Sequence, residues 1–456
     1  MSSIEYPFPE DFLWGTATSA YQIEGYNFNN DWYIFEQNPN NITNGEKAGI
    51  ATDHWNRYEE DYNFLEGMNV NSYRLSIEWS RIYPKKDKIN QQALKHYENM
   101  LKSLKKRKIK IMLNLHHFTI PLWFVDKGGF EHTENIRYFD EYTHTIAQRF
   151  REYVDIWCTI NEPIVVAVNG FLNKEFPPKK TSLSLAFKVG KNLMRMHASA
   201  YKIIKESNPT SMVGFVKHTP LFQPLTKHWG DRLRAKYANY MYIKSIFHSI
   251  KTGRMPFSFF KNSNLKNSLD YIGINYYSRM LASKKYFPQI YHGAPPNADP
   301  QYLCAGLGWQ PYPAGLYTIL KYISKIFPDK PIFIAENGIG TNNDEWRQYN
   351  LISHLLEVKR ALIDGMNIIG FHYWSLTDNW EWNHGFGPRF GLVHVDYDDL
   401  RRTIKDSGIL YAKICKNNGL SLSDINEAVN KFPNIDKTMR LRTLEVHGSQ
   451  SGSKGD

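Results

Sequence analysis

The stretch YVDIWCTINEP, residues 153–163, joins an apolar, β-rich run to an abrupt end at Asn-Glu-Pro. Tyr, Val, Ile, Trp and Thr favour a buried, pleated strand, and Pro163 ends the strand ladder because it has no N–H to donate. The run therefore predicts a strand that presents Glu162 at its carboxyl end. A second run of the same design, PIFIAENG at residues 331–338, predicts a strand that carries Glu336 at its tip.

A pair of carboxylates at strand tips suggests glycoside chemistry. In that chemistry one acid protonates the departing oxygen, while the other carboxylate attacks the sugar or activates water against it. Either glutamate taken alone has an ordinary alternative, as a charge beside a helix start or in solvent. The two together, with the side chains at the other strand ends, favour the catalytic interpretation.

The alternation of strand and helix recurs along the whole chain. Eight β-type runs occur, and amphipathic stretches with apolar residues at helical spacing separate most of them. This pattern predicts an α/β fold, a single (β/α)8 TIM barrel with long βα loops that form the active-site pocket. The expected strands are 12–19, 70–77, 109–116, 154–160, 212–217, 271–276, 332–335 and 368–374. The expected helices are 53–67, 91–106, 135–153, 183–208 and 350–365, and the long loops are 26–51, 170–181, 278–313 and 379–396.

The carboxyl ends of these strands are where the active site of such a barrel gathers. Arg74 is conspicuous, because an unpaired charge inside the apolar run YRLSI would be costly, so a buried partner is expected. His117 and Trp374, taken singly, also fit an ordinary core. The strand ends carry the polar or aromatic residues Gln22, Arg74, His117, Asn161, Glu162, His218, Asn275, Tyr277, Glu336 and Trp374.

Length and composition fit one large domain. The 456 residues exceed the usual domain size, but barrels hold this length in one unit. We expect residues 1–435 to form the barrel domain and residues 436–456, which end in HGSQSGSKGD, to form a disordered C-terminal tail. Aromatic residues make up 15% of the chain, which suits a pocket for the flat apolar faces of sugar rings.

The formal net charge of +11 raises the question of nucleic-acid binding. Such binding requires a basic patch, and the clearest basic run, KSLKKRKIK at residues 102–110, is typical of the solvated end of a surface helix. We therefore expect no nucleic-acid partner. The alternative, a protein that merely binds anionic polymers, predicts an affinity that falls steeply with salt and survives the loss of Glu336.

Cysteine usage and targeting signals indicate a cytoplasmic protein. Three widely spaced cysteines, Cys158, Cys304 and Cys415, argue against a disulfide framework or a zinc site and fit a reducing compartment. The N-terminal sequence MSSIEYPFPEDF lacks the basic and apolar regions of a signal peptide, and no window approaches the roughly eighteen apolar residues of a membrane span. We expect a soluble protein with no membrane partner.

Six motifs occur in order along the chain: FLWGTATSAYQIEG (12–25), YRLSIEWSRIYP (73–84), TINEP (159–163), GINYY (273–277), AENG (335–338) and WSLTDNWEW (374–382). From about residue 8 to 432 the chain resembles glycoside hydrolase family 1, the retaining β-glucosidases and β-galactosidases. The resemblance implies hydrolysis of terminal, non-reducing β-glucosyl, β-galactosyl or β-fucosyl residues of a small glycoside or short oligosaccharide. It implies no metal and no organic cofactor.

The resemblance also implies a role for individual residues. Glu162 matches the general acid/base, so we expect burial and a nearby anion to raise its pKa. Glu336 matches the nucleophile, and Arg74 and Tyr277 match the residues that donate to it and keep it ionised, in a catalytic set that includes Asn161. The expected carboxyl separation is about 5–5.5 Å. The substrate-binding set is Gln22, His117, Asn161, Asn275, Trp309, Trp374, Glu381, Trp382 and Phe390.

Glu381 and Glu162 narrow the choice of substrate within that family. Members that act on 6-phosphorylated sugars lack an acid at the position of Glu381, because a carboxylate would repel the phosphate. The resemblance therefore implies an unphosphorylated glycone. Plant thioglucosidases have Gln in place of the acid, so Glu162 argues against that activity.

The sequence departs from the pattern of that family at some positions, and several alternatives stay open. Phe118 stands where many members have Trp, Ala335 replaces the commoner Thr, and the stretch 218–271 is short, which puts the helices and loops after the fifth strand in doubt. One alternative is a transglycosidase, in which Trp309 and the 278–313 loop form an acceptor site. Another is a catalytically silent glycan-binding barrel, although such relatives have typically lost a catalytic Glu. Glucose, galactose and fucose, the natural aglycone and the oligomeric state also stay open.

Overall fold

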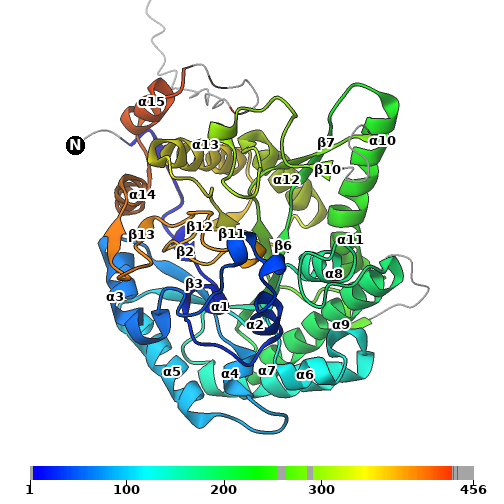
Figure 1. Ribbon diagram of the computed structural model, residues 1–456. Coiled ribbons are helices and arrows are strands. Elements are labelled where there is room, and N and C mark those ends of the chain that lie inside the picture. Colours follow the sequence, from blue (N-terminus) through cyan, green and yellow to red (C-terminus); the bar gives the residue numbers. More distant parts are fainter. Residues whose placement is uncertain (1–3, 255–262, 285–290, 434, 436–438, 440–456) are drawn as a thin grey trace, which may run out of the picture.

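The computed structural model describes residues 4–254, 263–284, 291–433, 435 and 439. Eight parallel strands close into a barrel in the order β2, β3, β4, β5, β6, β8, β11 and β12, with β12 paired to β2 (Figure 1). This confirms the (β/α)8 barrel and all its expected strands. The barrel strands are β2 (Leu13–Ala17), β3 (Ser72–Ser76), β4 (Lys110–Asn114), β5 (Ile156–Asn161), β6 (Met212–His218), β8 (Ile272–Asn275), β11 (Ile332–Asn337) and β12 (Ile368–Trp374).

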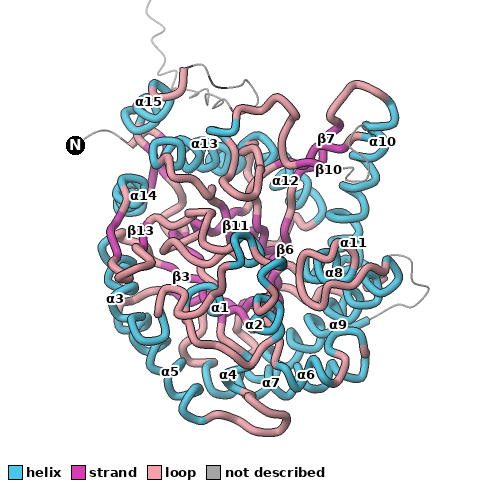
Figure 2. Tube along the Cα trace, in the orientation of Figure 1, coloured by secondary structure: helices cyan, strands magenta, loops and turns pink. Residues whose placement is uncertain are grey.

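Helices surround the strands, as Figure 2 shows with the helices in cyan and the strands in magenta. The expected helices are present as α3 (His54–Gly67), α5 (Gln91–Lys106), α7 (Ile136–Phe150), α9 (Leu183–Ser207) and α13 (Asp344–Ile363). Helix α13 begins earlier than predicted because Asn343 caps its first turn by accepting a bond from the Trp346 N–H. Further helices are α11 (Ser245–Thr252), α12 (Pro313–Ile326), α14 (Asp406–Asn417) and α15 (Leu422–Asn430).

Two hydrophobic clusters make up the core. The larger one includes the buried faces of the surrounding helices, such as Leu94, Tyr97 and Leu101 on α5. The smaller one comes from barrel strands and the residue directly before β8, and it consists of Met112, Ile156, Cys158, Val216, Tyr271, Phe333 and Ala335. A barrel filled in this way is a packed core and not a pore, so function falls to the carboxyl ends of the strands.

The long loops carry short elements of their own. The 26–51 loop contains α2 (Asp31–Glu36). The 278–313 loop supplies β9 (Arg279–Ala282) and β10 (Tyr291–His292), which form a small sheet with β7 (Leu221–Pro224), while residues 285–290 lie outside the described residues. The 379–396 loop contains the turn η9 (Trp382–His384) and β13 (Val393–Val395), which pairs with β14 (Arg402–Ile404).

The short stretch after the fifth strand of the barrel forms regular structure. Helix α10 (Trp229–Ala238) continues directly into a π-helical segment, η5 (Asn239–Lys244), and then into α11. Residues 255–262 lie outside the described residues, as does the predicted tail 436–456 apart from Met439. The π-helical segment matters because such bulges are frequent at functional sites.

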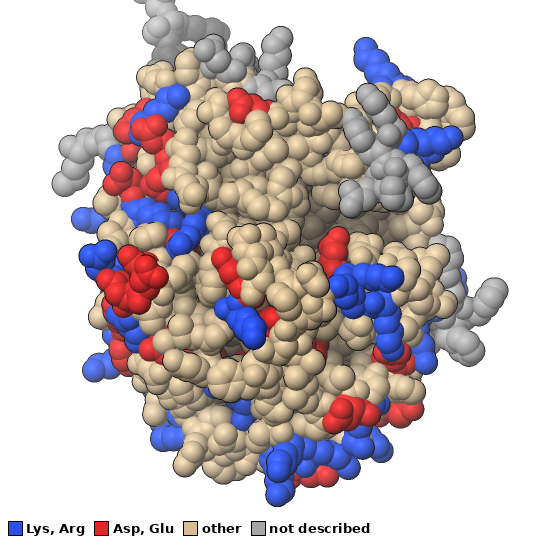
Figure 3. All heavy atoms as spheres, in the orientation of Figure 1, with Lys and Arg blue, Asp and Glu red and all other residues tan. Residues whose placement is uncertain are grey.

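The basic run 102–110 lies at the end of α5 and the start of β4, as predicted, and much of its charge is paired. Lys102 contacts Glu98 at 2.6 Å, while Lys105 and Lys110 both contact Asp155, at 3.1 and 3.2 Å. On the face shown in Figure 3, basic and acidic side chains lie intermixed around a surface that is hollowed near its middle. None of the helices within the described ranges has the length and apolarity needed to cross a bilayer.

Candidate active site

The two glutamates lie at the carboxyl ends of their strands, as the sequence predicts. Glu162 follows β5 and precedes α8 (Pro163–Phe171), and its backbone N–H donates to the Val216 carbonyl of β6 at 2.8 Å. Glu336 is the penultimate residue of β11 and pairs with Asn275 of β8. Only 8% of Glu162 and 4% of Glu336 is exposed, so both carboxyl groups lie in a largely desolvated setting.

The backbone of Glu162 adopts a left-handed conformation, with φ of 48° and ψ of 57°. Non-glycine residues seldom adopt this conformation unless the surrounding structure holds them there, and such residues cluster at functional sites. Asn275 Nδ2 donates to Glu162 Oε1 at 2.7 Å. Burial, followed by the nearby charge of Glu336, raises the pKa of Glu162 to about 8. The carboxyl group is therefore suited to carry a proton near neutral pH.

Glu336 has a donor on each carboxylate oxygen. The guanidinium of Arg74, which is fully buried, donates to Oε1, and the hydroxyl of Tyr277 donates to Oε2 at 2.5 Å. A carboxylate only accepts hydrogen bonds, so two donors of this kind match its acceptor oxygens and hold both of them in place. Arg74 thus has the buried partner that its place in an apolar strand requires.

Asparagine side chains connect the two glutamates. Arg74 Nη2 donates to Asn161 Oδ1 at 2.7 Å, and Asn275 Nδ2 donates to the same oxygen at 3.2 Å. Because Asn275 also donates to Glu162, a continuous chain of hydrogen bonds runs from Glu162 to Glu336. Side chains from β3, β5, β8 and β11 or the residues that follow them are held in one network.

Gln22 and Glu381 meet beside this network, although 359 positions separate them in the chain. Gln22 Nε2 donates to Glu381 Oε2 at 3.2 Å and to the side chain of Asn379 at 2.9 Å. Burial, followed by the charge of Glu336, raises the pKa of Glu381 to about 8. Within the described residues, Gln22 Oε1 is buried and accepts no hydrogen bond. A buried acceptor without a donor is suited to an incoming hydroxyl group.

Aromatic rings pack around His117. Its ring lies 5.9 Å from Trp374 and 6.0 Å from Trp382, with small interplanar angles. Asn161 Nδ2 contacts His117 Nε2 at 3.1 Å, and burial lowers the pKa of His117 well below its usual value. Phe118, where a Trp is common in the resembled family, packs against Trp382 with ring centroids 5.0 Å apart. The imidazole is therefore a neutral hydrogen-bonding group with an apolar surround.

A second aromatic group lies around Tyr277. Its ring centroid is 5.7 Å from that of Trp309 and 6.0 Å from that of Phe390. His218 also reaches this group, 6.5 Å from Trp309. The structure thus brings together all the residues that the sequence assigns to the site, including those from the 278–313 and 379–396 loops.

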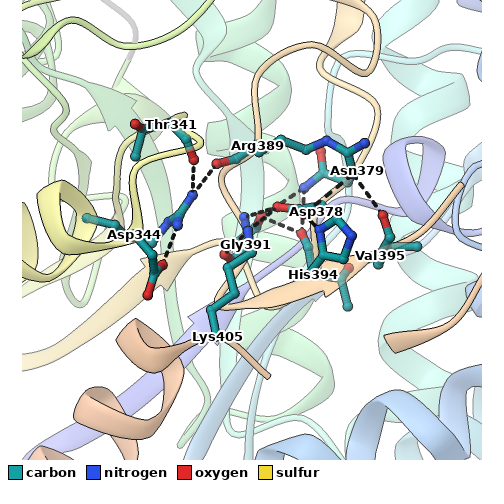
Figure 4. Close-up of polar contacts among 12 residues, drawn as sticks. Thr341, Asp344, Asp378, Asn379, Arg389, Gly391, His394, Val395 and Lys405 are labelled. Atoms are coloured by element: carbon teal, nitrogen blue, oxygen red, sulfur yellow. Dashed lines mark hydrogen bonds and ion pairs between the residues drawn. The ribbon is translucent and has the colours of Figure 1, made fainter. Parts of the chain in front are cut away.

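The sequence interpretation missed some residues next to the site. Lys217, near the end of β6, is 1% exposed, and its signal was available, since it is a charge within an apolar run just as Arg74 is. Tyr242 of η5 accompanies it, with its ring 3.9 Å from Lys217 Nζ. Asp378 was also missed. It is fully buried and is bonded by Lys405 and His394, as Figure 4 shows, and it lies three residues before Glu381.

Comparisons with known proteins agree with this geometry. Residues 4–420 match the model of glycosyl hydrolase family 1. Beta-glucosidase A of Thermotoga maritima is 32% identical over 91% of this chain and 98% of its own length. A beta-galactosidase of Sulfolobus acidocaldarius is 30% identical over 94% of this chain and 98% of its own length. The structure of the T. maritima beta-glucosidase in complex with glucoimidazole superposes with a TM-score of 0.85 at 31% identity, over 91% of this chain and all of that chain.

Proposed function

The chain belongs to glycosyl hydrolase family 1, and we propose that it is a glycoside hydrolase that retains the anomeric configuration of its substrate. We propose that it releases terminal, non-reducing β-D-glucosyl residues, and also β-galactosyl and β-fucosyl residues. The observation that carries the proposal is the contrast between its two glutamates. Glu162 is buried with a raised pKa, whereas Glu336 accepts from a guanidinium and a phenol. One acid is thus suited to give a proton and the other to attack.

The proposed reaction has two displacements. In the first, the Glu336 carboxylate attacks the anomeric carbon while Glu162 protonates the glycosidic oxygen, so the aglycone departs as an alcohol. In the second, the Glu162 carboxylate takes a proton from water, and the oxygen of that water displaces Glu336 from the sugar. Tyr277 and Arg74 hold the nucleophile in place throughout, through their bonds to its two oxygens.

Recognition of the sugar falls to the groups around Gln22 and His117. The free Gln22 Oε1, the Glu381 carboxyl group and the His117 ring offer polar atoms to sugar hydroxyls, and Trp374 offers an apolar face to the C–H side of the ring. We propose an unphosphorylated glycone, because Glu381 would repel a phosphate when ionised. The names of the relatives, a beta-glucosidase and a beta-galactosidase, support both glycones.

Two alternatives fit the same site. A transglycosidase would use the same glycosyl-enzyme but pass the sugar to an alcohol, and Trp309 beside Tyr277 provides an aromatic surface for such an acceptor. A catalytically silent barrel would bind glycans without turnover. The presence of both glutamates, each with its hydrogen-bond partner, favours catalysis.

A panel of aryl β-D-glycosides tests the proposal. Proton NMR of the first product should show the β-anomer of glucose, which then mutarotates, and the rates on glucoside, galactoside and fucoside should rank the glycones. Product analysis with and without an added alcohol separates hydrolysis from transfer. An α-anomer as the first product would overturn the retaining mechanism, and no turnover of any glycoside would favour the silent barrel.

We further propose that residues 1–435 act as one domain and that the protein works in the cytoplasm. The match to the family model over residues 4–420 supports the first point. The three cysteines support the second, since all are free, buried thiols, as expected in a reducing compartment.

A further inference from the structure

Lys217 is a buried amine next to the acid/base. Only 1% of the residue is exposed, and its Nζ donates to the His218 carbonyl at 2.7 Å. The same nitrogen lies 3.9 Å from the centroid of the Tyr242 ring. Across the described part of the chain, it forms no ion pair with a carboxylate. A buried ammonium held by one carbonyl and one ring is only partly compensated, and its desolvation is costly.

The carboxylate whose charge acts on this amine is Glu162. Its backbone N–H is bonded to the carbonyl of Val216, the residue directly before Lys217, so Glu162, which follows β5, and Lys217 of β6 lie on neighbouring stretches of backbone. Burial lowers the pKa of Lys217 to about 7, and the Glu162 carboxylate opposes that change. In return, the ammonium lowers the pKa of Glu162 against the larger effects of burial and Glu336.

The two titratable residues that contact this amine, His218 and Tyr242, have side chains that are neutral near pH 7. Burial lowers the pKa of His218 to about 3, and its Nδ1 contacts the Tyr242 hydroxyl at 3.0 Å. Burial raises the pKa of Tyr242 well above its usual value. The charges of Glu336 and Arg74 also act on Glu162, but these two residues form an ion pair with each other. The charge of Lys217 is therefore free to respond to the ionisation of Glu162.

We propose that Lys217 is a positioning residue that acts through Glu162, so that its buried ammonium stabilises the carboxylate left when Glu162 has given its proton to the aglycone. The inference rests on the proposed role of Glu162. No bond of Lys217 forms or breaks, and the amine contributes only a charge. Without it, Glu162 would hold its proton too tightly to act as an efficient acid. With a permanent cation instead, Glu162 would lose its proton at a lower pH.

The test compares Lys217→Met, wild type and Lys217→Arg in the pH dependence of kcat/KM for an aryl β-glucoside with a poor leaving group. Loss of activity at high pH reports deprotonation of the acid. Methionine removes the charge, while arginine keeps it at all accessible pH values. We expect the midpoint of the basic limb to fall in the order Met, Lys, Arg, with methionine about one pH unit above wild type.

Two control variants and a second substitution of Lys217 make the test decisive. Lys102→Met, on the surface of α5, removes a charge far from the site and should leave the midpoint unchanged. Tyr242→Phe keeps the ring under the amine and should also leave it unchanged. Should Lys217→Met fail to fold, as judged by circular dichroism, Lys217→Gln and the arginine variant still give the comparison. Equal midpoints in all folded Lys217 variants would overturn the inference.

Failure of the inference and failure of the proposed function can be told apart. If Glu162→Gln removes the basic limb while the Lys217 variants keep the wild-type midpoint, Glu162 is the acid and Lys217 does not tune it. If Glu162→Gln keeps the basic limb and loses as much activity on a good leaving group as on a poor one, the assignment of the acid itself is wrong, and with it the basis of the inference.

Discussion

Tyr277 donates its hydroxyl to Oε2 of Glu336 at 2.5 Å, on the carboxylate whose other oxygen accepts from Arg74. With a donor on each oxygen, the carboxylate is fixed both in place and in its plane. A nucleophile that needs no reorganisation before attack saves activation free energy. The rate of the proposed reaction should therefore depend on each of these two donors.

Replacement of Glu336 by Gln should abolish turnover. The amide cannot form the glycosyl-enzyme, and loss of a catalytic nucleophile costs on the order of 10⁴-fold or more in kcat. Steady-state kinetics with an aryl β-glucoside provide the measurement, and Glu345→Gln on the exposed start of α13 provides the matched control. Activity near the wild-type level in Glu336→Gln would refute its role, and it would bring back the anionic-polymer alternative if salt-sensitive binding also survived.

Tyr277→Phe should lower kcat/KM by about 10- to 100-fold. A hydrogen bond to a charged group contributes about 1.5–3 kcal/mol, and the ring itself, which packs on Trp309 and Phe390, is retained. Comparison of the double variant Tyr277→Phe/Glu336→Gln with Glu336→Gln alone shows whether the Tyr277 hydroxyl acts only through Glu336. A double variant that is no worse than Glu336→Gln alone would agree with this, whereas an unchanged rate in Tyr277→Phe would show that the hydroxyl is dispensable.

Glu162→Gln should discriminate between leaving groups. Loss of a general acid costs about 10²- to 10⁴-fold, but only where the departing oxygen needs a proton. We therefore expect formation of the glycosyl-enzyme from a dinitrophenyl glucoside to be spared relative to that from an alkyl glucoside. Pre-steady-state release of the phenol measures this step directly. An equal loss on both substrates would count against the acid role.

The pH profile follows from the raised pKa of Glu162. Burial and the charge of Glu336 raise it to about 8, and in the proposed reaction Glu162 acts as an acid only while it holds its proton. On the basic side, activity on substrates with poor leaving groups should thus be nearly full at pH 7 and fall as the pH rises through about 8. Glu381 also has a pKa of about 8, so the limb must be compared with that of Glu162→Gln. A midpoint near 5 would contradict the desolvated state of the acid.

Much of this site could be predicted because its signals are local. Glu162 and Glu336 each end an apolar run, and Arg74 lies inside one, where a charge demands a partner. Lys217 is also a charge in an apolar run, but it is the last residue of the expected strand 212–217, where a charge does not demand a buried partner. A strand that continues to His218 places that charge inside the run.

Other contacts could not be predicted from local patterns. Gln22 meets Glu381 only because β12 closes the barrel against β2, which brings the first and last motifs together. The apolar residues of the long loops show neither helical nor strand spacing, so the positions of their short strands and turns depend on tertiary contacts. The ion pairs that hold the loop carrying Glu381 could not be predicted from local patterns either, because they join residues from separate elements.

Asp378 offers a test of that loop. It is fully buried, it accepts from the Gly391 N–H at 2.9 Å, and Lys405 Nζ donates to it at 2.8 Å (Figure 4). Although burial raises its pKa, the bonds from His394 and Lys405 outweigh that effect and lower the pKa to about 2. Its contribution to stability is therefore present above pH 4 and lost as the pH falls towards 2.

Asp378→Ala should lower the free energy of unfolding by about 3–5 kcal/mol at pH 7, because it leaves the largely buried Lys405 without its carboxylate partner. Since Glu381 follows three residues later, we expect a higher KM for the glucoside, with a smaller change in kcat. Urea denaturation and steady-state kinetics measure the two effects. Asp396→Ala, whose ion pair with Arg401 spans 3.7 Å at the surface, is the control and should change neither. Unfolding free energies that agree within 1 kcal/mol for the two variants would show that the buried charges do not hold this loop.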